Sequence, residues 1–180
     1  MSLITVFEPR AFASLIETAD ERGDITIRPG DRVGFLHNTK ANGDLVLDRI
    51  AVLLGRETDI VTERLSKATA SMAATSDQLA SFVGACAVFT AMADCGSCTS
   101  WSCHDAVSLE RLGVPSVLVV STTFKPLAKS IVATLGLPDV RMLVLEHPVG
   151  GLQPAAVVSR VEAAYPVLRT RIRFTNASPQ

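Results

Sequence analysis

The chain has 180 residues, of which 48% are hydrophobic and 19% charged, and its formal net charge is −1. This length and apolar content are sufficient for one globular domain with a sizeable core. A net charge near zero argues against nucleic acid or an anionic membrane as a partner. The sequence also lacks an apolar run of about 18 residues and an N-terminal signal pattern, which predicts a cytoplasmic protein.

The first 31 residues are weakly patterned, and we interpret them as an N-terminal extension. Residues 11–19 are compatible with a short helix. Residues 24–31 are typical of an edge strand that breaks at the Pro29-Gly30 turn.

From residue 32 onward, apolar strands and amphipathic helices alternate along the chain. Strands are expected at residues 32–38, 59–65, 86–93, 115–122 and 140–147. Helices are expected at residues 42–57, 75–85, 99–113, 124–136 and 153–168. Five such repeats predict a single α/β domain over residues 32–172, followed by a tail over 173–180. The fold is a doubly wound, mainly parallel five-stranded sheet, flavodoxin-like, with strand order 2-1-3-4-5.

Ligands of open parallel sheets bind beyond the carboxyl ends of the strands. Polar residues follow the first, third, fourth and fifth predicted strands at this edge, in four segments that are far apart in the sequence. The residues expected to bind a substrate there are Asn38, Thr39, Lys40, Asn42, Gly96, Ser97, Thr99 and Thr122. This convergence predicts an active site at the carboxyl edge of the sheet.

Cys95 lies between the third strand, which is strongly apolar, and the helix that follows it. Free backbone N–H groups and the helix dipole favour a thiolate at such a position. Gly96 permits a tight turn beside the sulfur, and Cys98 follows at the Cys-x-x-Cys spacing of a one-turn disulfide. Asp94 opposes the thiolate, because a neighbouring carboxylate disfavours a second negative charge.

A zinc site is the main alternative for this cysteine cluster. Three cysteines and one histidine are nominally a Cys3His ligand set: Cys95, Cys98, Cys103 and His104. On a helix that begins near Cys98, however, Cys103 and His104 point roughly 140° and 240° away from it, and we expect no metal. Cys103 is expected to be a packing residue. Cys86 is expected in the core, about 30 Å from Cys95 at the other end of the third strand.

His37 and His147 each end a strand at the same edge, so either is a candidate general base for Cys95. His104 and Asp105 are candidates for supporting roles on the following helix. Asp105 shares the helical face of Cys98 but lies about 10 Å further along, too far for direct contact with the nucleophile.

Three segments of the chain resemble the UGSC-like family of selenoproteins and thiol proteins. "DCGSCTSWSCHDAVSLERLGVPSVLVV" resembles the family's signature, in which selenocysteine or cysteine is followed by Gly-Ser-Cys. "HNTKANGDLVLDRIAVLL" resembles its opening segment and "HPVGGL" its closing segment. The resemblance covers roughly residues 32 to 165 and puts the family's variable position at Cys95. Because selenium and sulfur exchange at this position, the resemblance implies that the Cys95 sulfur attacks a substrate or is oxidised.

The family is more distantly similar to the selenoprotein subunits of glycine and proline reductases, which use the same residue to cleave a bond reductively. "SLERLGVPSV" is also similar to aspartate/glutamate racemase and maleate isomerase relatives, which use two cysteines on opposite faces of the substrate. The first strand here ends in His37 and Asn38 without a cysteine, which argues against two-thiol chemistry.

The leading hypothesis is a thiol oxidoreductase that needs no cofactor, with Cys95 as nucleophile and Cys98 as resolving thiol. Its partners would be a small anionic substrate and a thiol reductant. A second hypothesis is a non-redox hydrolase or lyase in which His147 or His37 is the base for Cys95. A third is a non-catalytic subunit that binds a partner protein. The apolar composition also favours a homodimer.

Overall fold

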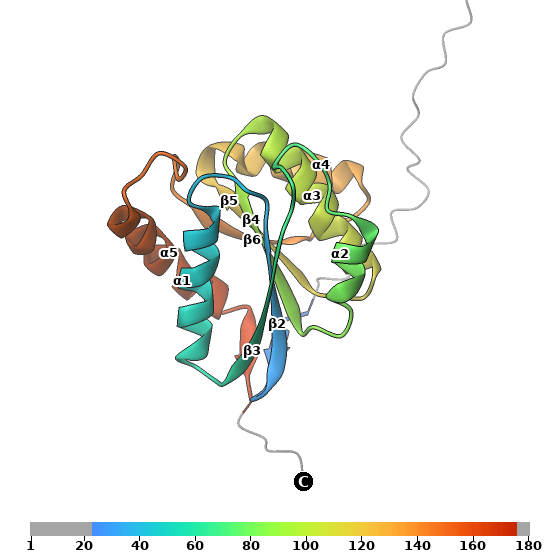
Figure 1. The fold of residues 1–180 in the computed structure, drawn as a ribbon, viewed down its shortest axis with the longest axis vertical. Helices are drawn as coiled ribbons and strands as arrows, with labels where there is room; N and C mark the ends of the chain where they lie inside the picture. The colour runs from blue at the N-terminus through green and yellow to red at the C-terminus, as the bar shows by residue number, and fades with distance from the viewer. Residues whose placement is uncertain (1–22, 176–180) are drawn as a thin grey trace, which may run out of the picture.

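The computed structural model describes residues 23–175, so the short helix expected at residues 11–19 lies outside the described part of the chain. Five parallel strands form the main sheet in the order β3-β2-β4-β5-β6 (Figure 1). The strands are β2 (Asp31–His37), β3 (Ile60–Ser66), β4 (Ala87–Ala93), β5 (Ser116–Ser121) and β6 (Arg141–Leu145). This order is the predicted 2-1-3-4-5, and the doubly wound α/β fold is confirmed.

Helices cover both faces of the sheet (Figure 1). They are α1 (Gly43–Gly55), α2 (Ser76–Ser81), α3 (Gly96–Arg111), α4 (Lys125–Thr134) and α5 (Pro154–Arg169), with a short 3₁₀ turn at Thr122–Phe124. The helices α1 and α5 pack together on one face, and α2, α3 and α4 lie on the other. No helix within residues 23–175 is long and apolar enough to span a membrane.

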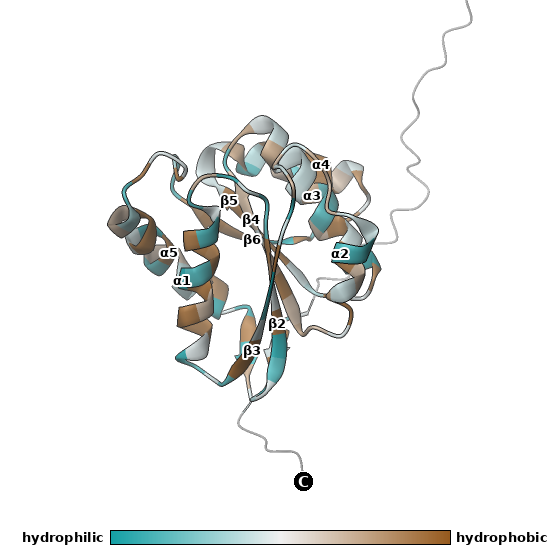
Figure 2. Cartoon of the chain, viewed as in Figure 1, coloured by the Kyte–Doolittle hydropathy of each residue, from teal (hydrophilic) through white to brown (hydrophobic). Residues whose placement is uncertain are grey.

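The buried strands explain why this layered arrangement forms. All seven residues of β4 and all six of β5 are buried, as expected for the central strands of a parallel sheet that is covered on both faces. Figure 2 shows hydrophobic residues along these strands and on α1 and α5, with hydrophilic residues alternating on the outer turns of the helices. The apolar sides of the helices therefore pack on the sheet and fix the carboxyl ends of the strands at one edge.

A second, two-stranded parallel sheet joins the two ends of the described chain. It pairs β1 (Ile25–Ile27) with β7 (Ile172–Phe174), and its isoleucines pack into the core formed with α1 and α5. The sequence pattern predicted a strand near residue 25 but missed β7. Three residues after a helix are too short a run to show an alternating pattern.

Two helix boundaries differ from the sequence expectation. The helix expected over residues 75–85 ends at Ser81, because the chain turns through Gly84 with a φ of +86°. The helix expected from Thr99 begins earlier, at Gly96, with Cys95 as its N-cap residue. The second difference moves Cys95 directly onto the helix N-terminus.

Candidate active site

Cys95 and Cys98 lie together at the first turn of α3. The Cys95 sulfur accepts the backbone N–H of Cys98 at 3.3 Å, which makes it the side-chain cap of the helix. Cys98 points inward and is fully buried, and its thiol lies 3.2 Å from the Cys95 carbonyl oxygen. Cys95 itself is half-buried and both thiols are free, so the geometry combines an accessible sulfur with a protected neighbour.

Burial, together with a side-chain interaction with Cys95, raises the pKa of Cys98 to about 11. The Cys98 thiol donates to the Cys95 carbonyl oxygen, a contact that also requires this thiol to keep its proton. Cys98 is therefore protonated at neutral pH.

Asp94, the residue before Cys95, orients His147. Its carboxylate oxygen Oδ1 lies 2.9 Å from Nδ1 of His147, and Oδ2 accepts the backbone N–H groups of Val149 and Gly150. Because a carboxylate can only accept, Nδ1 carries the proton and Nε2 is left as the basic nitrogen. The imidazole is one-third exposed, whereas the carboxylate is 4% exposed.

The contacts around Asp94 keep its carboxyl group ionised. Burial raises its pKa, but hydrogen bonds from Gly150, Ser121, Val149 and His147 lower it more, and the net pKa lies below the ordinary value. From its position next to Cys95, Asp94 is expected to oppose a thiolate. Its carboxylate is instead engaged by His147 and the following loop, a role that the residues adjacent to it do not reveal.

Several of the residues expected to bind substrate are engaged with the protein itself. Asn38 is 1% exposed, and its amide group bonds both the carbonyl and the N–H of Met92 and the hydroxyl of Ser102. Asn42, at a φ of +63°, donates to the carbonyl oxygens of Val149 and Leu152. These two side chains hold the loops of the site in place.

Three further candidates also have protein partners. Nε2 of His37 lies 3.2 Å from the carbonyl oxygen of Lys40, a contact in which this nitrogen donates and so cannot act as a base. The Thr99 hydroxyl donates to the Cys95 carbonyl oxygen at 2.6 Å. The Thr122 hydroxyl accepts the backbone N–H of His147. Both neutral imidazoles keep one basic nitrogen, Nδ1 in His37 and Nε2 in His147, and His147 is the one oriented by a buried carboxylate.

The residues that do face outward at this edge are Thr39, Lys40, Gly96 and Ser97, of which Lys40 is half-buried and the others are exposed. Lys40 reaches toward Asp94 across Gly150. A Cβ atom at Gly150 would lie 3.5 Å from the Asp94 carboxylate and 3.6 Å from Cε of Lys40. The loops after β2, β4 and β6 therefore meet beside Cys95.

The two candidates for supporting roles on α3 lie in different environments. His104 is exposed and its ring contacts that of Trp101. Asp105 is 1% exposed and forms an ion pair with the equally buried Lys67. Sequence reasoning missed Lys67, which follows β3, because this strand end was not among the four that were considered.

The remaining cysteines lie apart from Cys95 and Cys98. Cys103 is buried against α4, and burial raises its pKa to about 12. Cys86 lies at the other end of β4, where burial raises its pKa to about 11. Among residues 23–175, no group of three or more His, Cys, Asp or Glu side chains is arranged to hold a metal ion.

Comparison with models of known protein families shows which family the chain belongs to. The model of the UGSC family matches residues 5–173, nearly the whole length. The chain belongs to the UGSC family. This confirms the resemblance seen in the cysteine signature and extends it at both ends, whereas the more distant similarity to reductase selenoproteins stays a prediction. No curated protein matches the chain.

Proposed function

We propose that this UGSC-family protein is a thiol enzyme in which Cys95 attacks a small anionic substrate and Cys98 resolves the product as a disulfide. The observation that carries the proposal is the pairing of two free thiols at the N-terminus of α3, one accessible and one buried. The backbone N–H of Cys98 donates to the Cys95 sulfur at the start of α3, which favours Cys95 as the nucleophile.

The reaction would proceed in two steps. The Cys95 thiolate forms a bond to an electrophilic atom of the substrate, and the group previously bonded to that atom leaves with the bonding electrons. Cys98 then loses its proton and attacks the Cys95 sulfur, and the remaining substrate fragment leaves with the electron pair of its sulfur bond and takes up a proton. The two thiols are oxidised to a disulfide and the substrate gains two electrons. A dithiol reductant, of the kind that a cytoplasm supplies, restores both thiols.

The outward-facing groups at this edge favour an anionic substrate. Lys40 supplies a positive charge, and the exposed backbone of Gly96 and Ser97 supplies N–H groups at the start of α3. The hydroxyl of Thr39 is exposed beside them, although it also donates to the Asn38 carbonyl oxygen. Asn38 and Asn42 do not face the substrate but hold the neighbouring loops in place through side-chain hydrogen bonds to the backbone.

A second function is favoured by the Asp94–His147 pair. An imidazole that is oriented by a buried carboxylate is the general base of non-redox thiol catalysis, in which the substrate forms a thioester or related adduct with Cys95. In this mechanism Nε2 of His147 removes a proton and later returns it to the leaving group, and Cys98 has no covalent role.

Mass spectrometry after mild peroxide treatment separates the two functions. The redox proposal predicts a Cys95–Cys98 disulfide that dithiothreitol reverses, and it predicts the same product in a Cys103→Ser control. Persistent oxidation of Cys95 to a sulfinic acid without any disulfide would contradict it. A Cys98→Ser variant that still turns over substrate through a stable adduct on Cys95 would establish the non-redox function.

A further inference from the structure

One face of α3 is polar although it is buried. Cys98, Ser102 and Asp105 are spaced by four and three residues, so they lie along the same side of the helix. None is more than 1% exposed. Each contacts a different loop at the carboxyl edge of the sheet, and the contacts of Asp105 are not used by the proposed reaction.

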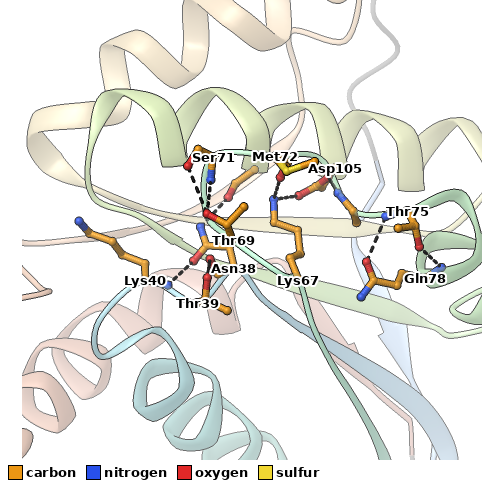
Figure 3. Close-up of polar contacts among 12 residues, drawn as sticks. Asn38, Thr39, Lys40, Lys67, Thr69, Ser71, Met72, Thr75, Gln78 and Asp105 are labelled. Carbon is orange, nitrogen blue, oxygen red and sulfur yellow. Dashed lines mark hydrogen bonds and ion pairs between the residues drawn. The ribbon is translucent and has the colours of Figure 1, made fainter.

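Asp105 fastens both ends of the loop between β3 and α2 to α3. At the start of the loop, Nζ of Lys67 lies 2.5 Å from Oδ2 of Asp105 and donates to the Met72 carbonyl oxygen at 2.7 Å. At its end, the N–H of Ala74 donates to Oδ1 of Asp105 at 2.8 Å. Figure 3 shows this ion pair and the loop that is folded around it. Residues 67–74, which we call the β3–α2 loop, are thus fixed to the helix that begins beside Cys95.

The β3–α2 loop starts directly beside the residues proposed to hold the substrate. The backbone N–H of Lys67 donates to the His37 carbonyl oxygen at 2.8 Å, so the loops after β2 and β3 leave the sheet side by side. In Figure 3, Thr69 and Ser71 lie on the same side of the Lys67–Asp105 pair as Lys40. The loop therefore extends from its anchor toward the anion-binding side of the site.

The contact that holds the β3–α2 loop is a buried ion pair, and this bears on its role. Two buried charges are no more stabilising than apolar residues of similar volume, because both must lose their water. The pair instead fixes the path of the loop, because Lys67 and Asp105 each form a hydrogen bond with a second, defined backbone group of the loop. An apolar pair would fill the same space without fixing the path of the loop.

We propose that Lys67 and Asp105 are positioning residues that hold the β3–α2 loop as a wall of the Cys95 site, next to Lys40, and thereby set its affinity for an anion. This inference rests on the proposed function. The pair acts through the loop and does not touch the reacting atoms.

Protection of Cys95 from iodoacetamide by inorganic phosphate tests the proposal, with labelling measured at each cysteine. In the wild-type protein, phosphate slows labelling of Cys95. In a Lys67→Met/Asp105→Leu double variant, which leaves no unpaired buried charge, the phosphate concentration for half protection rises about tenfold while the labelling rate without phosphate changes less than twofold. An Ala68→Gly/Ala73→Gly variant, which keeps the ion pair and loosens the exposed part of the loop, gives a smaller rise in the same direction.

The matched control is Glu110→Gln/Arg141→Met, which disrupts another buried ion pair of α3 at the far end of the helix. It lowers the melting temperature and leaves protection by phosphate unchanged. Half-protection concentrations that stay at the wild-type value in both loop variants, or absence of protection in the wild-type protein, would overturn the inference. The proposed function fails separately, if iodoacetamide shows no preference for Cys95 in the wild-type protein.

Discussion

At the scale of single residues, the site depends on side chains whose partners are far away in the sequence. Asp94 meets His147 and Gly150, which follow it by 53 and 56 residues. Apolar runs show roughly where strands end: Asp94 directly follows β4 as expected, whereas the strand expected to reach His147 ends at Leu145. The sequence pattern could not show that the Asp94 carboxylate is directed to His147, since this depends on the path of the loop after β6.

Replacement of Asp94 by asparagine should destabilise the protein at neutral pH, by about 2 kcal/mol, because charge-assisted hydrogen bonds are lost. The folded-state pKa of Asp94 lies below its unfolded value, so its contribution is present above about pH 4 and is lost as the pH falls through the folded-state pKa. Urea unfolding at pH 7 and pH 3 should therefore show a larger difference between wild type and variant at pH 7 than at pH 3.

The control for this comparison is Asp139→Asn, which removes an exposed carboxylate. It should leave the free energy of unfolding nearly unchanged at both values of pH. Equal effects of the two substitutions at pH 7 would contradict the role assigned to Asp94.

At the scale of elements, α3 carries both the candidate reactive cysteines and the side chains that hold neighbouring loops. Its first turn carries Cys95 and Cys98, and Ser102 and Asp105 further along bond the loops after β2 and β3. The sequence predicted the helix and its place after a buried strand. It missed the first turn, because a cysteine is an uncommon N-cap residue and gave no start signal.

The capping role of Cys95 predicts different stabilities for two variants at this position. Cys95→Ser keeps a side-chain acceptor for the Cys98 N–H, and serine is a favourable N-cap residue, so the melting temperature should be equal to or above that of the wild type. Cys95→Ala removes the acceptor and should lower the free energy of unfolding by about 1 kcal/mol. Thermal unfolding followed by circular dichroism would measure both. If the two variants were equally stable, the cap would contribute nothing.

At the scale of the whole molecule, the packing of the sheet includes one very close approach between β2 and the residue that follows α2. Gly34 in β2 allows the ring of Phe82, just after α2, to approach the strand closely. A Cβ atom at Gly34 would lie 2.5 Å from a ring carbon of Phe82 and 2.8 Å from a methyl carbon of Val88. The sequence shows a glycine in a strand but cannot show which side chain takes the space beside it.

Gly34→Ala should therefore lower the free energy of unfolding by about 1–3 kcal/mol, since a ring and a strand must shift to admit one methyl group. Gly55→Ala is the matched control. A Cβ atom there would meet nothing within 4 Å, and alanine should stabilise the end of α1 by up to about 1 kcal/mol. Chemical denaturation of the two variants would measure the difference, and a neutral Gly34→Ala would show that this contact is not tight.

The central claim, that Cys95 is the reactive sulfur of this UGSC-family protein, is tested most directly by thiol alkylation as a function of pH, resolved for each cysteine by mass spectrometry. We predict that iodoacetamide modifies Cys95 first at neutral pH, and that Cys86, Cys98 and Cys103 react appreciably only in alkaline solution or after unfolding, since burial raises their pKa values to about 11, 11 and 12. Labelling of any of these three ahead of Cys95 in the folded protein would contradict the account.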